Sequence, residues 1–131
     1  YLNNVSVLPN IPKKQVLQYL DRSDAGLIHL KKNDLYKTVI PSKMFEYMAM
    51  GVPILHGVAG ESLDIIRRYK VGVCFESENP ESLCLSILKL YNNRELYDVI
   101  SKNCVTTAKV FNRETLALKM LEEIKKFEKK K

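Results

Sequence analysis

The 131-residue sequence has the composition of an ordinary folded domain, with 46% hydrophobic and 27% charged residues. No apolar run approaches the roughly 20 residues that a transmembrane helix needs, so we expect no membrane-spanning segment. The net charge is +6, and much of the excess comes from lysines at positions 125, 126, 129, 130 and 131. A basic helix end is favoured by the helix dipole, and no aromatic residues are interleaved with basic ones, which argues against a nucleic-acid interface. Weak attraction to anionic lipid headgroups stays open as an alternative.

Residues 1–4 show neither an initiator methionine nor the basic and apolar regions of a signal peptide. We therefore expect a piece of a longer protein, and the length predicts a single domain over residues 1–131. The pattern of expected secondary structure changes near residue 78. Residues 1–78 alternate between strand and helix patterns, whereas residues 79–131 show helix patterns alone.

This alternation predicts an α/β fold: a Rossmann-like parallel sheet with flanking helices, followed by a C-terminal helical tail. Pro12 and Pro80 mark helix starts, because proline suits the first helical turn. Strands are expected at residues 5–8, 25–30, 53–58 and 72–75. Helices are expected from Pro12 to about residue 20, at 42–50, 61–69, 80–91 and 95–110, and from about 112 onward.

The cysteines and histidines do not form a metal-binding pattern. Cys74, Cys84 and Cys104 are odd in number and lack metal-ligand spacing, and two histidines cannot build a multi-histidine site. We therefore expect no metal. Cys74 and Cys84 fall in apolar patterns and are predicted to be small core residues with reduced thiols, which favours a cytoplasmic location.

Ligands of parallel α/β sheets bind outside the carboxyl ends of the strands, in loops that lead into helices. Three loops of this kind are expected, at residues 9–13, 31–42 and 56–61. Gly57 and Gly60 in the third loop would let a backbone approach a ligand closely, although an ordinary tight turn explains them equally well.

Glu46 is the one acidic residue in an otherwise apolar run from Met44 to Met50. A carboxylate in such a place is costly unless a donor meets it, so we expect a polar group to approach this helix. A pair with Lys43 is the structural alternative, in the less favourable orientation for a helix. Ser42 is expected first as an N-cap and only secondarily as a phosphate contact.

Two residues near the third loop also have alternatives. His56 follows a buried strand and could face a sugar, but a core histidine with satisfied hydrogen bonds is the stronger interpretation. Glu61 opens a helix, where the dipole stabilises an acidic residue whatever its function.

The segment from Ile40 to Ile54 resembles the donor-binding signature of GT-B glycosyltransferases of the retaining, family 4 (glycosyl transferases group 1) type. Residues 55–62, residues 71–76 and the closing helical region extend the resemblance over nearly the whole chain. The subgroup that it most resembles makes bacterial capsule and O-antigen and includes the WbuB-like aminosugar transferases. The resemblance implies that this chain is part of the donor-binding domain of a GT-B fold.

In that family, the second glutamate of a two-glutamate motif hydrogen-bonds the ribose of a nucleotide-sugar, and Glu46 lies at this position. The first position falls on Thr38, so the chain departs from the pattern and the resemblance assigns no catalytic residue. The helix N-terminus would meet the diphosphate, where Lys43 either neutralises phosphate or is a surface lysine, and the loop of Pro9 would lie near the base. The residues expected at the donor are Pro9, Asn10, Ile40, Pro41, Ser42, Lys43, Glu46 and Gly60.

The resemblance implies transfer of a hexose or N-acetylhexosamine from a UDP- or GDP-sugar to an acceptor hydroxyl in bacterial polysaccharide synthesis, without a cofactor or metal. Relatives hold the diphosphate with an Arg and a Lys that would precede Tyr1, and their acceptor domain is N-terminal as well. We therefore expect a donor-binding fragment that is inactive alone, whose partners are the nucleotide-sugar and the acceptor domain of the same protein. Peripheral membrane association of the full-length protein is a further option.

Two other classes of protein are open. A non-catalytic nucleotide-binding or assembly module could keep the fold after losing the first glutamate. A flavodoxin- or receiver-like interaction domain would have a cluster of acidic residues after an early strand, and the sequence has no such cluster.

Overall fold

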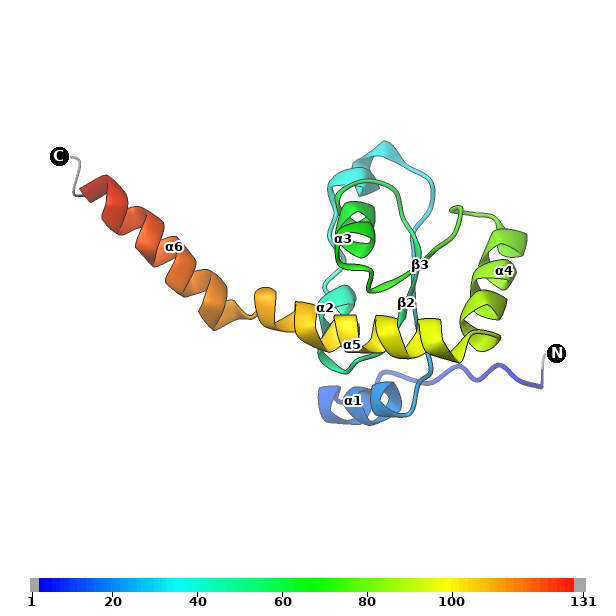
Figure 1. Ribbon diagram of the computed structural model, residues 1–131. Helices are drawn as coiled ribbons and strands as arrows, with labels where there is room; N and C mark the ends of the chain where they lie inside the picture. The colour runs from blue at the N-terminus through cyan, green and yellow to red at the C-terminus, as the bar shows by residue number, and fades with distance from the viewer. Residues whose placement is uncertain (1–2, 129–131) are drawn as a thin grey trace.

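The computed structural model describes residues 3–128, and its centre is a three-stranded parallel sheet (Figure 1). The strands are β1 (Gly26–His29), β2 (Ile54–Gly57) and β3 (Gly72–Cys74), in the spatial order β1-β2-β3. Both strand pairs are parallel, as the alternation of strands and helices predicts. The expected α/β fold with flanking helices and a C-terminal helical tail is confirmed.

Helices alternate with the strands and then form the second half of the chain. They are α1 (Lys13–Asp21), the short 3-10 helix η1 (Asp34–Thr38), α2 (Lys43–Ala49), α3 (Glu61–Tyr69), α4 (Pro80–Tyr91), α5 (Arg94–Val110) and α6 (Arg113–Glu128). Asparagines begin α4 and α5: the side chain of Asn79 accepts from the backbone N–H of Ser82, and that of Asn93 from Leu96. These local caps explain why the sequence predicts both helix starts closely.

The hydrophobic core lies where α2, α3 and α5 meet the sheet. Met44 and Met48 of α2 are fully buried, as is Ile54 of β2. Helix α5 packs against α2 and contributes Cys104, whose thiol donates to the carbonyl of Val71 at 3.3 Å. The two methionines therefore anchor α2, the helix that carries Glu46, to the centre of the molecule.

Helix α6 extends away from the rest of the molecule (Figure 1). Its apolar residues, which recur at helical spacing, are exposed: Leu116, Met120, Leu121, Ile124 and Phe127. Lysines 129–131, part of the basic end expected from the sequence, lie outside the described residues. No helix within residues 3–128 is both long and apolar enough to cross a membrane.

The expected strand at residues 5–8 is wrong. This segment forms no strand, and Val7 is 93% exposed. Its alternating apolar residues satisfy the local pattern of a strand, but a strand also needs a neighbour for its backbone hydrogen bonds. Within the described residues, the sheet consists of β1, β2 and β3 alone, and none of them pairs with this segment.

The expected place of Cys84 in the core is also wrong. Cys84 of α4 is exposed, and so are the apolar side chains of Leu88 and Tyr91 on the same helix. The helix instead buries Ser86 and Leu90. The hydroxyl of Ser86 donates to the carbonyl of Cys74 at 3.2 Å, so contact with the end of β3 decides which face turns inward.

Candidate functional site

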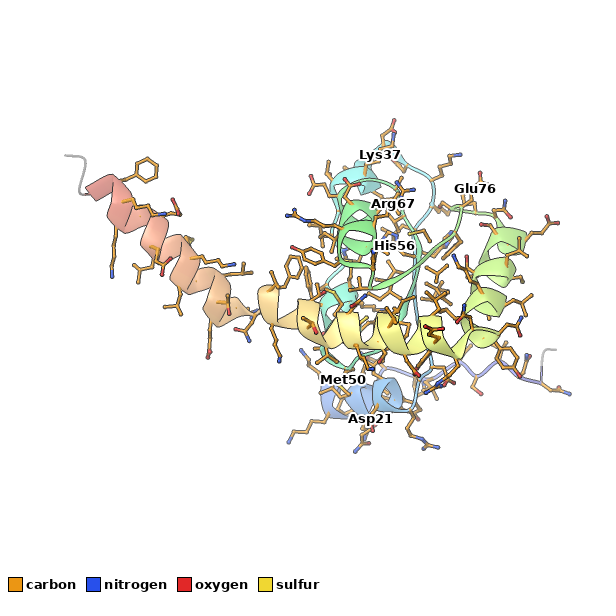
Figure 2. All side chains as sticks on the ribbon, in the orientation of Figure 1. Asp21, Lys37, Met50, His56, Arg67 and Glu76 are labelled. Carbon is orange, nitrogen blue, oxygen red and sulfur yellow. The ribbon has the colours of Figure 1, made fainter. Side chains whose placement is uncertain are left out.

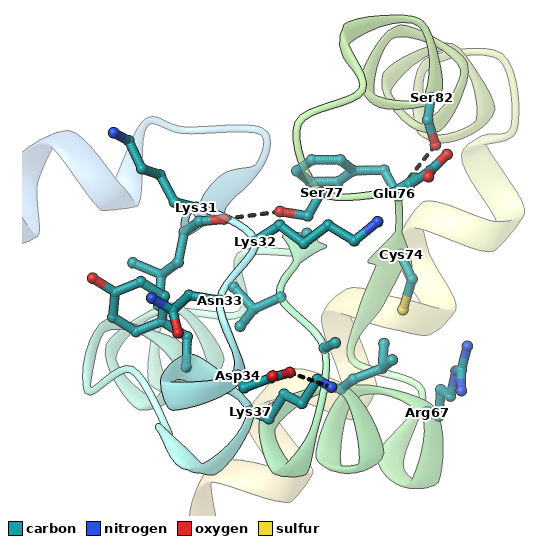
Figure 3. A pocket seen from close by; sticks show the side chains of 17 residues that line it. Lys31, Lys32, Asn33, Asp34, Lys37, Arg67, Cys74, Glu76, Ser77 and Ser82 are labelled. Carbon is teal, nitrogen blue, oxygen red and sulfur yellow. Dashed lines mark hydrogen bonds and ion pairs between the residues drawn. The ribbon is translucent and has the colours of Figure 1, made fainter.

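A cleft of about 730 Å³ opens at the carboxyl ends of the three strands (Figure 3). This is the edge where parallel α/β sheets bind ligands. It is lined by Leu30, Lys31, Lys32, Asn33, Asp34, Tyr36, Lys37, Gly57, Val58, Ala59, Leu63, Arg67, Cys74, Phe75, Glu76, Ser77 and Ser82. The loops after β1 and β2 were expected to bind a ligand, and the loop after β3 adds a third wall that the sequence did not indicate.

The loops after β1 and β3 are tied together above β2, although these two strands are not neighbours. The hydroxyl of Ser77 donates to the carbonyl of Leu30 at 2.8 Å. The backbone N–H of Glu78 donates to Nε2 of His29 at 3.2 Å, and its carboxylate accepts from the N–H of Lys32 at 3.3 Å. Glu78 has φ 61°, in the left-handed region that few non-glycine residues adopt, so these bonds hold a strained turn.

Charged side chains surround the cleft. Lys37 pairs with Asp34 at 2.7 Å, and this hydrogen bond lowers the pKa of the Asp34 carboxyl. Burial raises the pKa of the Cys74 thiol, and the positive charge of Arg67 acts in the opposite direction. In Figure 2, Lys37 and Glu76 lie at the end of the molecule opposite Asp21 of α1. Among the described residues, no group of three or more His, Cys, Asp or Glu side chains could hold a metal ion.

Glu46 does not line this cleft. Its side chain is 36% exposed, and its Oε1 lies 3.6 Å from Nζ of Lys13. The expected polar partner therefore exists, and it comes from α1 rather than from Lys43 on the same helix. Lys13 directly follows the segment 9–12, so this contact joins the helix that follows Pro9 and Asn10 to the helix that carries Glu46.

The turn that enters α2 is largely exposed. Ser42 stands at the N-cap position, but its side chain makes no capping hydrogen bond, contrary to the expectation. The carbonyl of Pro41 accepts from the N–H of Met44 at 3.0 Å, so the backbone closes the first turn by itself. Ile40 is 38% exposed, and Lys43 is exposed as well. Contact of Ile40, Pro41, Ser42 and Lys43 with the donor therefore stays a prediction.

Thr38 ends η1 in the loop after β1, and Gly60, in the loop after β2, lies against the residue that precedes Thr38. The hydroxyl of Thr38 donates to the carbonyl of Leu35 at 3.2 Å, which closes the last turn of η1. Gly60 has φ 96°, and a Cβ on it would overlap the backbone of Lys37, the residue before Thr38. The glycine is therefore needed for close approach between two protein loops, whether or not it also approaches a ligand.

Replacing Gly60 by alanine should lower the free energy of unfolding by about 1–3 kcal/mol, because it adds backbone strain and an overlap with the Lys37 carbonyl. Gly51→Ala is the matched control, since Gly51 also has positive φ, 69°, but its Cβ would overlap no backbone atom and would meet a methyl group of Val105 at 3.1 Å and the hydroxyl of Ser101 at 3.4 Å. Urea denaturation measures the free energy of unfolding of both variants. Equal losses would show that the contact with Lys37 is unimportant.

His56 is a buried core residue, as the structural interpretation of the sequence predicts (Figure 2). Its Nδ1 accepts from the N–H of Val58 at 3.4 Å, so its proton resides on Nε2, which lies 3.1 Å from the hydroxyl of Ser62. Burial lowers its pKa to about 4. A neutral histidine held in this way supports the loop after β2 and does not face the cleft as a charged group.

None of the eight residues expected at the donor lines the cleft. The residues that sequence reasoning missed come from the loops after β1 and β3 and from α3; they include Lys32, Arg67, Glu76 and Ser77. The clustering of lysines at positions 31, 32 and 37 in one strand-to-helix loop was the available signal. No sequence signal pointed to Arg67, because its position at the cleft depends on how α3 packs.

Comparison with known proteins places the chain in a family. The family described as Glycosyl transferases group 1 matches residues 1–105. Among solved structures, sucrose-phosphate synthase from Thermosynechococcus elongatus is similar, with a TM-score of 0.79 and 16% identity. The similarity covers 99% of this chain and 32% of that one, so this chain spans about a third of its length, and at this identity the likeness shows the fold alone. No curated protein gives a significant sequence match. Because the family match extends over most of its length, the chain belongs to the glycosyl transferases group 1 family.

Proposed function

We propose that this chain is the nucleotide-sugar-binding part of a bacterial glycosyltransferase. The enzyme would transfer a hexose or N-acetylhexosamine, with retention, from a UDP- or GDP-linked donor during synthesis of a polysaccharide such as capsule or O-antigen. Membership of the family and the GT-B-like fold support the proposal. A cytoplasmic location, with peripheral contact to the membrane, belongs to the same proposal.

The contact between Lys13 and Glu46 is the observation that carries the proposal. Lys13 directly follows the segment that holds Pro9 and Asn10, which are expected near the base, and Glu46 is the carboxylate that is expected at the ribose. An exposed lysine at 3.6 Å is a weak partner, because surface ion pairs contribute about 0–1 kcal/mol. A ribose hydroxyl can therefore compete for the Glu46 carboxylate at little cost.

The chain by itself would bind the donor without turning it over. Thr38 occupies the position of the first acid, and its hydroxyl is hydrogen-bonded within η1. The acceptor domain and the Arg and Lys expected to hold the diphosphate are proposed to belong to other parts of the full-length protein. Departure of the nucleoside diphosphate would depend on such cations, because they stabilise the charge that develops on the leaving phosphate.

Binding of UDP or GDP should raise the melting temperature of the chain, since a ligand that binds only the native state stabilises it. Glu46→Gln should weaken the preferred nucleotide by about tenfold or more, the effect of losing a hydrogen bond to a charged acceptor. Titration calorimetry measures the dissociation constants. Glu122→Gln on α6 is the matched control, with the same loss of charge at a distant exposed position. Equal affinities in both variants would contradict the role of Glu46.

Thr38 favours one other candidate, a non-catalytic nucleotide-binding module of the same fold. The two candidates differ in turnover by the full-length protein. A glycosyltransferase releases nucleoside diphosphate from its nucleotide-sugar in the presence of acceptor, whereas a binding module shows the same affinity with no release.

A further inference from the structure

The cleft at the carboxyl ends of the strands is separate from the residues expected at the donor, and it has the features of a second binding site. We propose that it binds an organic phosphate, with Lys32 and Arg67 meeting the phosphate and an apolar floor receiving the organic part. The proposal does not depend on the donor site around Glu46.

Unpaired positive charge is the first argument. Lysines 31, 32 and 37 and Arg67 line the cleft, against the carboxylates of Asp34 and Glu76. Asp34 is engaged by Lys37, and the carboxylate of Glu76 accepts from the side-chain amide of Asn79 at 3.0 Å. Among residues 3–128, no ion pair involves Lys31, Lys32 or Arg67. The cleft therefore keeps cations available for an anionic ligand.

The placement of these cations is the second argument. In Figure 3, the side chains of Lys32 and Arg67 lie on either side of Cys74 at the cleft, and they come from the loop after β1 and from α3. Arg67 lines the cleft, and its positive charge acts on the pKa of the Cys74 thiol, so the guanidinium lies close to Cys74 in the wall of the cleft. A planar guanidinium and an ammonium that line one cavity suit the several oxygens of a phosphate.

An apolar floor is the third argument, and it selects an organic phosphate over an inorganic one. Val58 is 6% exposed, and the partly buried side chains of Leu63 and Phe75 lie beside it in the lining. Gly57 leaves the floor without a side chain, because a Cβ there would overlap the ring of Phe75. The volume of about 730 Å³ is within the range of small-molecule sites.

The walls are held in place before any ligand arrives. The hydrogen bonds of Ser77 and Glu78 to the loop after β1 join the two sides of the cleft across β2. The N–H of Glu76 donates to the hydroxyl of Ser82 at 2.9 Å, which fixes the loop against α4. A ligand would therefore order few loop residues on binding, and this reduces the entropy that binding loses.

Phenyl phosphate, inorganic phosphate and benzyl alcohol are suitable probes, followed on the 131-residue chain by amide chemical shifts in NMR. Phenyl phosphate should bind about tenfold or more tightly than inorganic phosphate, because its ring covers the apolar floor. Benzyl alcohol, which lacks the anion, should bind more weakly than phenyl phosphate. The shifts should appear at residues 57–59 and 74–77.

Arg67→Gln and Lys32→Gln should each weaken phenyl phosphate by about tenfold or more. Arg68→Gln is the matched control, because Arg68 is adjacent in sequence but outside the lining and packs over the ring of Tyr69. Binding that is absent, equal losses for Arg67→Gln and Arg68→Gln, or shifts at residues 9–10 and 40–46 in place of the cleft would each overturn the proposal. Cleft shifts that phenyl phosphate still causes in Glu46→Gln would support a separate site, whereas their loss in that variant would overturn it.

The two proposals fail in distinguishable ways. Loss of nucleotide binding in Glu46→Gln tests the donor site and should leave phenyl phosphate binding unchanged. Arg67→Gln should change only phenyl phosphate binding.

Discussion

Replacing Met48 by alanine should lower the free energy of unfolding by about 2–5 kcal/mol, the range for a long side chain removed from a packed core. Met48 is fully buried and lies on α2, where that helix packs against α5. The substitution leaves a cavity that the surrounding helices and β2 can fill only in part. Urea or thermal denaturation of the purified chain measures the loss.

Met120→Ala is the matched control for this prediction, because Met120 is 64% exposed on α6. The same atoms are removed there from water rather than from the core, so the expected change is within about 0.5 kcal/mol. A loss as large for Met120 as for Met48 would mean that α6 packs against a surface as the core does. A negligible loss at Met48 would contradict the placement of α2.

Lowering the pH from about 6.5 to about 4 should remove on the order of 3 kcal/mol of stability through His56 alone. The ordinary pKa of a histidine, near 6.5, applies to the unfolded chain, whereas burial lowers the pKa in the folded chain to about 4. Between these values, the unfolded state binds a proton that the folded state excludes. The contribution is therefore complete above the unfolded pKa and is lost as the pH falls toward the folded one.

The hydrogen bonds of His56 explain why the folded state excludes this proton. Nδ1 already accepts from the N–H of Val58, so a proton on Nδ1 would place two donors against each other in the interior. Urea denaturation between pH 4 and 7.5 measures the effect. The variant His29→Gln, at an exposed histidine, should keep the steep dependence on pH, and His56→Gln should reduce it. An unchanged slope in His56→Gln would contradict the role of His56.

The sequence was sufficient to predict the elements of this fold because their signals are local. Asn79 and Asn93 cap the helices that follow them, and Pro80 suits a first turn. The near-continuous apolar run around β1 predicts a strand, and the parallel sheet follows from the alternation with helices. The expected burial of the whole strand is wrong, because β1 ends the order of the described strands and its Leu27 and His29 are exposed. Segment 5–8 shows the limit of such signals, since its pattern was that of a strand but no strand lies beside it among the described residues.

The candidate binding sites were harder to predict from the sequence, because they depend on how distant segments pack. The apolar run around Glu46 predicted that a polar group would approach, but the partner, Lys13, comes from another helix 33 positions earlier in the chain. The sequence was sufficient to predict that His56 is a core residue, because it lies in a strand that was expected to be buried. The cleft could not be predicted in full, because Lys32 and Glu78 are joined across 46 positions of sequence, above a strand that separates them.

The sequence by itself determined the order of helices and strands from α1 onward, apart from η1, and the family to which the chain belongs. Those features depend on side-chain spacing over a few residues, where helix and strand periods and capping residues act directly. Only the tertiary structure decided which face of α4 is covered, which lysine meets Glu46 and which cations surround the cleft. Each of these is a contact between distant segments, and its existence depends on how helices pack on the sheet rather than on any local pattern.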